Sequence, residues 1–456
     1  MNHGRSSGER NCEPELTFER ISCLTEQFRN DPKARLAQNA VTQTTASDVA
    51  MNREIVVDAD FSFSHVLDDW PVTNQKRSGR CWMFAALNLM RVNTMKSLGL
   101  KDFEFSQNYT LFWDKFERSN YFFEEIIATA DQPVNERLVS YMLSEPLSDG
   151  GQWNMAVNVI RKHGLVPKSV MPESESSSNT GRMNATLKFK LREGARDLRA
   201  AAQEGASLDE LRAQKHHQLE HIWRILCIHL GTPPREFDWQ WTDKDKTFHR
   251  DGLITPQGFA ARYMSLPLED YVCLVHDPRP ENEFGRTYTV DFLGNVVGGE
   301  SVTYLNVEMA QMKAIARQQI EEGEPVWFGC DVGKQMRRDL GIWDEHLFDY
   351  ENLYDTHFTL DKAARLHYGQ TQMTHAMLFT GVDIVDGSAR RWKVENSWGD
   401  KNGRKGFYQM NDSWFDQYVF EIAAPKRLLS ATLLNALDSE AAVLPAWDPM
   451  GALARG

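Results

Sequence analysis

Long apolar runs are missing from this chain of 456 residues. No stretch approaches the ~20 consecutive apolar residues that a membrane-spanning helix needs. The first thirty residues also lack the apolar segment of a secretory signal peptide. We therefore expect a protein that is not inserted in a membrane and that stays in the cytoplasm.

Cysteine is scarce as well, and its residues show neither a CxxC pair nor the spacing of a disulfide framework. The six cysteines are Cys12, Cys23, Cys81, Cys227, Cys273 and Cys330. Thiols scattered in this way suit a reducing compartment better than secretion. The sequence therefore predicts free cysteines, and we expect neither a metal ion nor a cofactor.

Basic residues are outnumbered by acidic ones, 51 to 64, which gives a net charge of −13. The charges are interspersed and form no sustained basic stripe, which argues against binding to nucleic acid or to an anionic membrane. A nucleic-acid-binding protein is kept as the alternative from another function class, because composition does not exclude a locally basic channel. A salt-dependent shift of single-stranded DNA would discriminate between the two.

Apolar residues make up 41% of the chain, which is enough for a substantial core. We predict a flexible N-terminus at 1–14, a helical lobe at 15–175, an inserted helical subdomain at 176–265, a strand-rich lobe at 266–425 and a C-terminal tail at 426–456. Within the insertion, Ser207 and Glu210 form a capping box, and Gly231 stops the helix that follows it.

Cys81 begins the most clearly marked helix, because Phe84, Leu87, Met90 and Met95 follow it at helical spacing. The helix macrodipole stabilises a thiolate at this position, and a nearby imidazolium would stabilise it further. We therefore expect the thiol to be ionised at neutral pH and to act as a nucleophile.

An Asp-Gly pair at 386–387 predicts a tight hairpin between two extended segments. Reflecting the chain through this turn places His375 opposite Trp398, two residues beyond Asn396. With a bulge or a slightly longer loop, His375 and Asn396 are within side-chain reach. The Asn oxygen can then accept from one ring N–H and leave the other ring nitrogen to face a nucleophile, with Trp398 covering the bond.

Gln75 precedes Cys81 by six residues and can turn its amide N–H groups toward the same space. Together with the Cys81 backbone N–H, it would form an oxyanion hole for a tetrahedral intermediate. The expected catalytic set is thus Cys81 as nucleophile, His375 as acid and base, Asn396 as orienting group, and Gln75 with the Cys81 N–H as oxyanion hole.

The blocks that hold these residues resemble the motifs of papain-like cysteine peptidases, in the same chain order. They are Gln75-Lys-Arg-Ser-Gly-Arg-Cys81-Trp82, Thr374-His375-Ala376 and Glu395-Asn396-Ser397-Trp398-Gly399. In addition, Asp149-Gly150-Gly151-Gln152-Trp153 resembles the glycine-rich wall of the cleft, where substrate backbone pairs in an extended manner. The resemblance implies an α+β fold with a helical lobe and an antiparallel β lobe, here with a helical insertion and a C-terminal tail in the active-site cleft.

Two departures from the usual pattern point to the bleomycin hydrolase family, the cytosolic aminopeptidase branch. Ser78 stands where a second Cys is common, and His375 and Asn396 lie far beyond the roughly 130–150 residues that usually follow the nucleophile. Further segments with this resemblance are 105–107, 112–115, 171–174, 277–282, 327–334 and 444–454. The likeness runs from about residue 15 to the C-terminus.

This resemblance implies an aminopeptidase that assembles as a homohexamer, with active sites facing an inner cavity. A tail carboxylate at Ala454 would hold the free amino group of a peptide substrate, and Gly150, Gly151 and Trp398 would contact the peptide as well. The family also hydrolyses the carboxamide of bleomycin and the thiolactone of homocysteine. An endopeptidase is the alternative within the enzyme class, and the intact tail argues against it.

Some residues carry a plainer interpretation. The chain continues past Ala454 with Arg455 and Gly456, and the sequence leaves open whether these two are trimmed. His216, His217 and His221 invite a metal hypothesis, but they lack the HExxH order and suit a solvated helical face better. The basic patch at 334–338 is likewise typical of a solvated surface.

Overall fold

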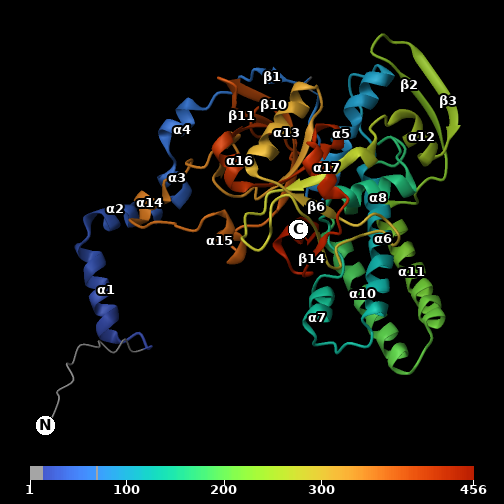
Figure 1. Ribbon diagram of the computed structural model, residues 1–456, viewed down its shortest axis with the longest axis horizontal. Coiled ribbons are helices and arrows are strands. Elements are labelled where there is room, and N and C mark those ends of the chain that lie inside the picture. The colour runs from blue at the N-terminus through green and yellow to red at the C-terminus, as the bar shows by residue number, and fades with distance from the viewer. Residues whose placement is uncertain (1–13, 68–69, 456) are drawn as a thin grey trace. The chain divides into compact units, whose positions relative to one another are not determined.

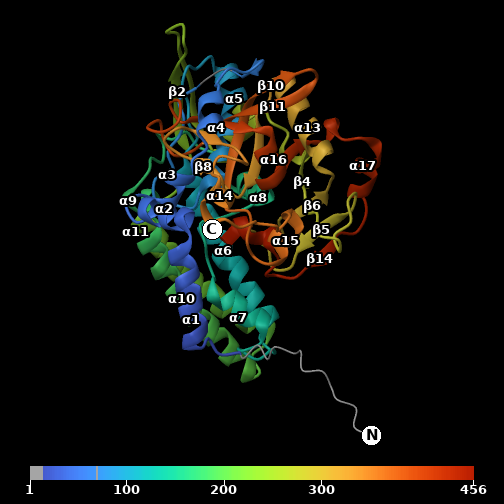
Figure 2. The ribbon, with the colours of Figure 1, turned by 90° about the vertical axis from the view of Figure 1, so that its left-hand side faces the viewer.

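The computed structural model describes residues 14–67 and 70–455 (Figures 1 and 2). Cys12, Gly456 and almost all of the predicted N-terminal segment 1–14 lie outside the described residues. The chain divides into two compact units, one with residues up to 57 and 346–359, the other with 58–345 and 360 onward. Among the described residues, every helix is too short or too polar to cross a membrane.

This division differs from the predicted one, because residues up to 57 separate from the helical lobe. The helices of the smaller unit are α1 (Phe18–Asn30), α2 (Pro32–Val41), α3 (Ala46–Ala50), α14 (Tyr350–Tyr354) and most of α4 (Arg53–Asp58). Asp31 caps α2 through hydrogen bonds to two backbone N–H groups at its start. Within this unit, the backbone N–H of Asp349 donates to Ala50 at 2.7 Å and ties α14 to α3.

The helical part of the larger unit surrounds one continuous hydrophobic core. Its helices are α5 (Cys81–Leu98), α6 (Gln107–Ala128), α7 (Arg137–Ser144), α8 (Trp153–His163), α9 (Glu175–Ser178), α10 (Gly181–Gln203), α11 (Leu208–Leu230), α12 (Pro256–Tyr263) and the 3-10 turn η1 (Leu268–Asp270). Helix α5 begins at Cys81 as predicted, and it ends at Gly99, which adopts a left-handed φ of 63°. Buried residues cover almost all of its length, so α5 is a central helix.

The region predicted as a helical insertion contains α10 and α11, which pack on each other and on α6 (Figures 1 and 2). The capping box of Ser207 and Glu210 is confirmed, as is the end of α11 before Gly231. The region also holds an antiparallel hairpin of β2 (Phe237–Thr242) and β3 (Phe248–Ile254), which the prediction did not include. The sequence feature that indicates this hairpin is the alternation of aromatic and polar residues in β2.

A mixed, mostly antiparallel sheet runs in the order β14-β5-β6-β4-β13-β7-β10-β11-β12-β9-β8, and β1 also pairs with β10. The strands are β1 (His65–Val66), β4 (Tyr271–Val275), β5 (Thr287–Val290), β6 (Thr303–Asn306), β7 (Val326–Cys330), β8 (Met336–Arg337), β9 (Ile342–Trp343), β10 (His375–Val385), β11 (Ser388–Glu395), β12 (Phe407–Asn411), β13 (Val419–Pro425) and β14 (Ala442–Leu444). The α+β class is thereby confirmed.

Strands β7 and β10 are buried on both faces, so the sheet separates two cores. Trp327 and Ala376 face the core of α5, whereas Phe328 and Met377 face a second core. That second core lies under helix α13, which packs on β7, β10 and β13. The remaining elements of this lobe are α13 (Met309–Glu321), α15 (Lys362–His367), α16 (Asp412–Tyr418), α17 (Ala431–Leu437) and the 3-10 turns η2 (Lys426–Leu428) and η3 (Pro449–Arg455).

The predicted hairpin is confirmed at its turn, where Val385 pairs with Ser388 and Asp386 has a positive φ of 50°. The register shifts by one residue after Asp383 and shifts back after Phe379. The two bulges cancel, so the strands leave the hairpin in the register that simple reflection gives. This register carries the first residue of β10 and the residues after β11 toward the same end of the sheet.

Candidate active site

Cys81 is the first residue of α5, and the loop that precedes it is held by contacts on two sides. The guanidinium of Arg80 is buried and pairs with Glu173 at 2.7 Å. The backbone N–H of Gly79 donates to the Asp149 carboxylate at 3.1 Å. These contacts fix the turn before the helix, so the nucleophile's backbone has little freedom.

Asp149 gathers donors from several elements around this loop. Lys115 pairs with it at 2.7 Å, and Asn184 and Thr180 donate to it as well. Burial alone would raise the pKa of Asp149, but Lys115 and these hydrogen bonds hold the pKa well below its usual range. The carboxylate is therefore charged and acts as a clamp for the loop that carries Cys81.

His375 and Asn396 meet where β10 begins and β11 has ended. The imidazole Nε2 and the Asn396 Oδ1 are 2.9 Å apart, and the backbone N–H of Ser397 donates to the same oxygen at 2.7 Å. Because an amide oxygen only accepts, Nε2 carries the proton and Nδ1 is left as an acceptor. The ring of Trp398 lies 4.8 Å from the His375 ring and covers the bond.

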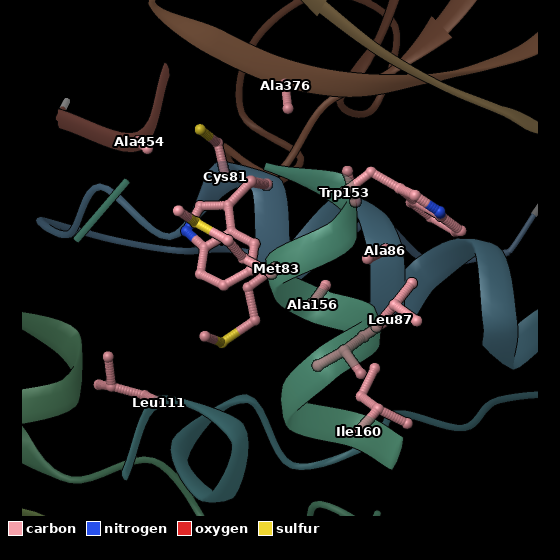
Figure 3. Close-up of a cluster of buried hydrophobic side chains, with 14 of the residues drawn as sticks. Cys81, Met83, Ala86, Leu87, Leu111, Trp153, Ala156, Ile160, Ala376 and Ala454 are labelled. Carbon is pink, nitrogen blue, oxygen red and sulfur yellow. The ribbon is translucent and has the colours of Figure 1, made fainter. Parts of the chain in front are cut away.

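The fold brings Cys81 to His375 through the contact of α5 with β10. The backbone N–H of Ala376, the residue after His375, faces the Cys81 sulfur, as do the N–H groups of Cys81 and Trp82. Figure 3 shows Cys81 with its sulfur directed away from the packed core, toward the space between Ala376 and Ala454.

Burial changes the expected protonation of this pair. It raises the pKa of the Cys81 thiol to about 11, against the lowering effect of the three N–H groups. It also lowers the pKa of His375 to about 4, because a lone imidazolium would lose its water. Burial therefore opposes the expected ionisation of each of the two groups taken alone.

Gln75 is buried beside the loop that carries the nucleophile. Its backbone N–H donates to Ser397 at 2.9 Å, and its side-chain Nε2 donates to Ser78 at 2.6 Å. An amide nitrogen carries two N–H groups. One of them is therefore engaged with the loop, and the second is left for another acceptor.

The two glycines of the predicted wall lie against the helical lobe. Gly151 packs on the ring of Trp82, where any Cβ would overlap the ring. The carbonyl of Gly150 accepts from Arg118 at 2.8 Å. Only glycine permits this close approach, so the wall and the helix of Cys81 are packed as one piece.

The C-terminal tail belongs to the same buried cluster as the nucleophile, and Ala454 and Cys81 appear next to each other in the view of Figure 3. The Ala454 carbonyl accepts from the Ser148 hydroxyl and, at 3.5 Å, from Arg118. Strand β14 adds the tail to the sheet through parallel pairing with β5. Arg455 continues over the ring of Tyr141, 4.6 Å from the ring centroid.

Sequence reasoning missed the group that joins the two halves of the site. Glu395, immediately before Asn396, is buried and pairs with Arg91 of α5 at 3.0 Å. Asn88 and Trp70 donate to the same carboxylate at 2.9 and 2.6 Å. A local sequence pattern does not predict these bonds to Glu395, because the partners lie about three hundred residues apart in the chain.

The candidates with a plainer interpretation lie elsewhere. His216, His217 and His221 are exposed on α11, and His217 pairs with Glu220. In the described part of the chain, no group of three or more His, Cys, Asp or Glu side chains is placed to hold a metal ion. Residues 334–337 of the basic patch are half-buried, whereas Arg338 is exposed and stands over Trp398.

Comparisons with known proteins agree with this geometry. Residues 15–451 match the peptidase C1-like family. Aminopeptidase C of Lactobacillus delbrueckii subsp. lactis is 43% identical over 444 residues, and mouse bleomycin hydrolase is 43% identical over 449, each across 96% of this chain and 99% of the relative. The crystal structure of PepW from Lactobacillus rhamnosis superposes with a TM-score of 0.94 at 45% identity, covering 96% of this chain and 99% of that one. With the papain-like fold in place, the chain belongs to the peptidase C1-like family and is a cysteine-type aminopeptidase.

Proposed function

We propose that Cys81, His375 and Asn396 carry out the hydrolysis. His375 takes the thiol proton on Nδ1, and the thiolate attacks the carbonyl carbon of the first peptide bond. His375 then gives the proton to the leaving amine, and later activates the water that releases the acyl-enzyme. Asn396 holds the ring in the tautomer that this sequence of steps requires.

The free N–H of Gln75 and the backbone N–H of Cys81 would stabilise the oxyanion. This role is supported by the position of Gln75, which is fixed from both sides of the cleft by Ser78 and Ser397. Because the site is buried, hydrogen bonds to the developing charge are stronger there than in water.

The observation that carries the exopeptidase proposal is the placement of Ala454 in the buried cluster that holds Cys81, with its carbonyl held by Ser148 and Arg118. A tail in this position would obstruct the part of the cleft that precedes the scissile bond. The terminal carboxylate would pair with the α-ammonium of a peptide, so substrates need a free N-terminus. Arg455 and Gly456 follow Ala454, and mass spectrometry of the purified protein will show which residue bears that carboxylate.

Several finer expectations belong to the same proposal. The carboxamide of bleomycin and the thiolactone of homocysteine are acyl donors that suit a thiolate, and relatives named bleomycin hydrolase are similar over nearly their whole length. We further propose a cytoplasmic homohexamer with its active sites in an inner cavity. Such a cavity would favour short or unfolded peptides.

The experiment that tests this function compares a fluorogenic amino-acid amide with its N-acetylated counterpart. We expect the free amine to be hydrolysed and the acetylated form to be cut at least roughly 100-fold more slowly, because an ion pair is lost in a desolvated site. Equal rates for the two substrates would contradict the aminopeptidase proposal and favour an endopeptidase.

Ser148→Ala should loosen the tail without touching the reacting groups. It removes the hydroxyl that donates to the Ala454 carbonyl. We expect KM for the free amine to rise several-fold and discrimination against the acetylated substrate to fall, with kcat little changed. Ser140→Ala, an exposed hydroxyl on α7, is the matched control and should leave both constants as they are.

A further inference from the structure

Arg338 lies near His375, with the ring of Trp398 in contact with both side chains. It is an exposed residue in the connection between β8 and β9. Its guanidinium carbon lies 4.5 Å from the centroid of the Trp398 ring, and that ring lies 4.8 Å from the ring of His375. The three side chains form a stack that leads from the imidazole to the solvent.

The charge of Arg338 is not balanced by an acid. Its neighbours are paired, Arg337 with Asp339 at 2.7 Å and Lys334 with Asp331 at 4.0 Å. Within residues 70–455, Arg338 itself has no carboxylate within ion-pair distance. A cation held over an aromatic ring keeps its charge and has its orientation largely set.

The reaction places the leaving fragment beside His375. Figure 3 shows Ala454 and Ala376, the neighbour of His375, on opposite sides of the Cys81 sulfur, and His375 has to protonate the leaving amine. A peptide that continues beyond the scissile bond therefore runs along Trp398. Because an extended chain advances ~3.5 Å per residue, a carboxylate one or two residues beyond that bond can reach the guanidinium.

We propose that Arg338 binds the C-terminal carboxylate of the leaving fragment, which makes dipeptides and tripeptides the preferred substrates of this site. The inference rests on the proposed function, since it assumes cleavage at Cys81. A guanidinium matches a carboxylate with two parallel hydrogen bonds, so a free acid is recognised over an amide. The bound carboxylate also offsets a positive charge that would otherwise oppose the imidazolium formed during acylation.

The test uses the purified full chain and three peptides with the same N-terminal residue. They are Leu-Gly-Gly, its C-terminal amide, and Leu followed by five glycines. We expect wild type to cleave the free tripeptide about tenfold more efficiently than the amide, mostly through KM, and the long peptide at the efficiency of the amide. Arg338→Gln should remove the preference by weakening only the free tripeptide, and Arg338→Lys should retain part of it.

The control variant is Arg337→Gln, which removes an equal charge from the same loop and should keep the wild-type preference. Equal efficiencies for the acid and the amide in wild type would overturn the inference and leave the aminopeptidase untouched. A uniform loss on all three peptides in Arg338→Gln would show a structural role and overturn it as well. If wild type cut none of the peptides, the proposed function itself would fall, and this inference with it.

Discussion

Cys81→Ala should lower kcat/KM for amino-acid amides by at least roughly 10⁴-fold, because it removes the atom that forms the acyl-enzyme. Cys81→Ser should be almost as inactive, since burial disfavours ionisation even of the more acidic thiol. Steady-state hydrolysis and titration with a thiol-directed alkylating agent measure the effect. Activity should fall in proportion to the alkylation of Cys81, which peptide mass spectrometry distinguishes from labelling of the exposed Cys23.

The matched control is Cys227→Ala, which alters a half-buried thiol on α11 outside the cleft. It should retain wild-type kinetics. Thermal unfolding of both alanine variants distinguishes a loss of catalysis in Cys81→Ala from a loss of folded protein. Full activity in Cys81→Ala would show that the nucleophile has been assigned to the wrong residue, and the mechanism would have to be abandoned.

Glu395→Ala should destabilise the protein by roughly 3–5 kcal/mol, the range for breaking a buried ion pair on one side. It would leave the guanidinium of Arg91 buried without its counter-charge, and it would strip Asn88 and Trp70 of their acceptor. Denaturant unfolding followed by fluorescence measures the change. Because Glu395 precedes Asn396, we also expect the remaining folded enzyme to have a lower kcat.

An exposed carboxylate provides the comparison for this variant. Glu440→Ala, just before β14, should change the free energy of unfolding by no more than about 0.5 kcal/mol. If Glu395→Ala were equally mild, the ion pair would not hold the strand of Asn396 to the helix of Cys81. A stability loss without any change in kcat would separate the structural role of the link from a role in catalysis.

Residues close together in sequence were the ones that local patterns could place. The helix starting at Cys81 followed from apolar spacing, and the tight turn followed from an Asp-Gly pair whose Asp accepts a positive φ. The approach of His375 to Asn396 followed from that turn, because strand geometry converts a hairpin into neighbouring side chains. The hairpin β2–β3 was not predicted, because its short aromatic alternation lies among longer segments with helical periodicity.

What the sequence by itself determined is therefore the chemistry and its local setting: a thiol at a helix start, an imidazole and an amide across a turn, and a tail with a family resemblance. Tertiary structure alone decided which partners meet. It brought Glu395 to Arg91, Ser148 to Ala454 and Arg338 to Trp398. It also raised the pKa of the Cys81 thiol, because burial depends on the whole packed core. Backbone preferences act over a few residues, whereas burial and ion pairing are properties of segments that only the folded chain assembles.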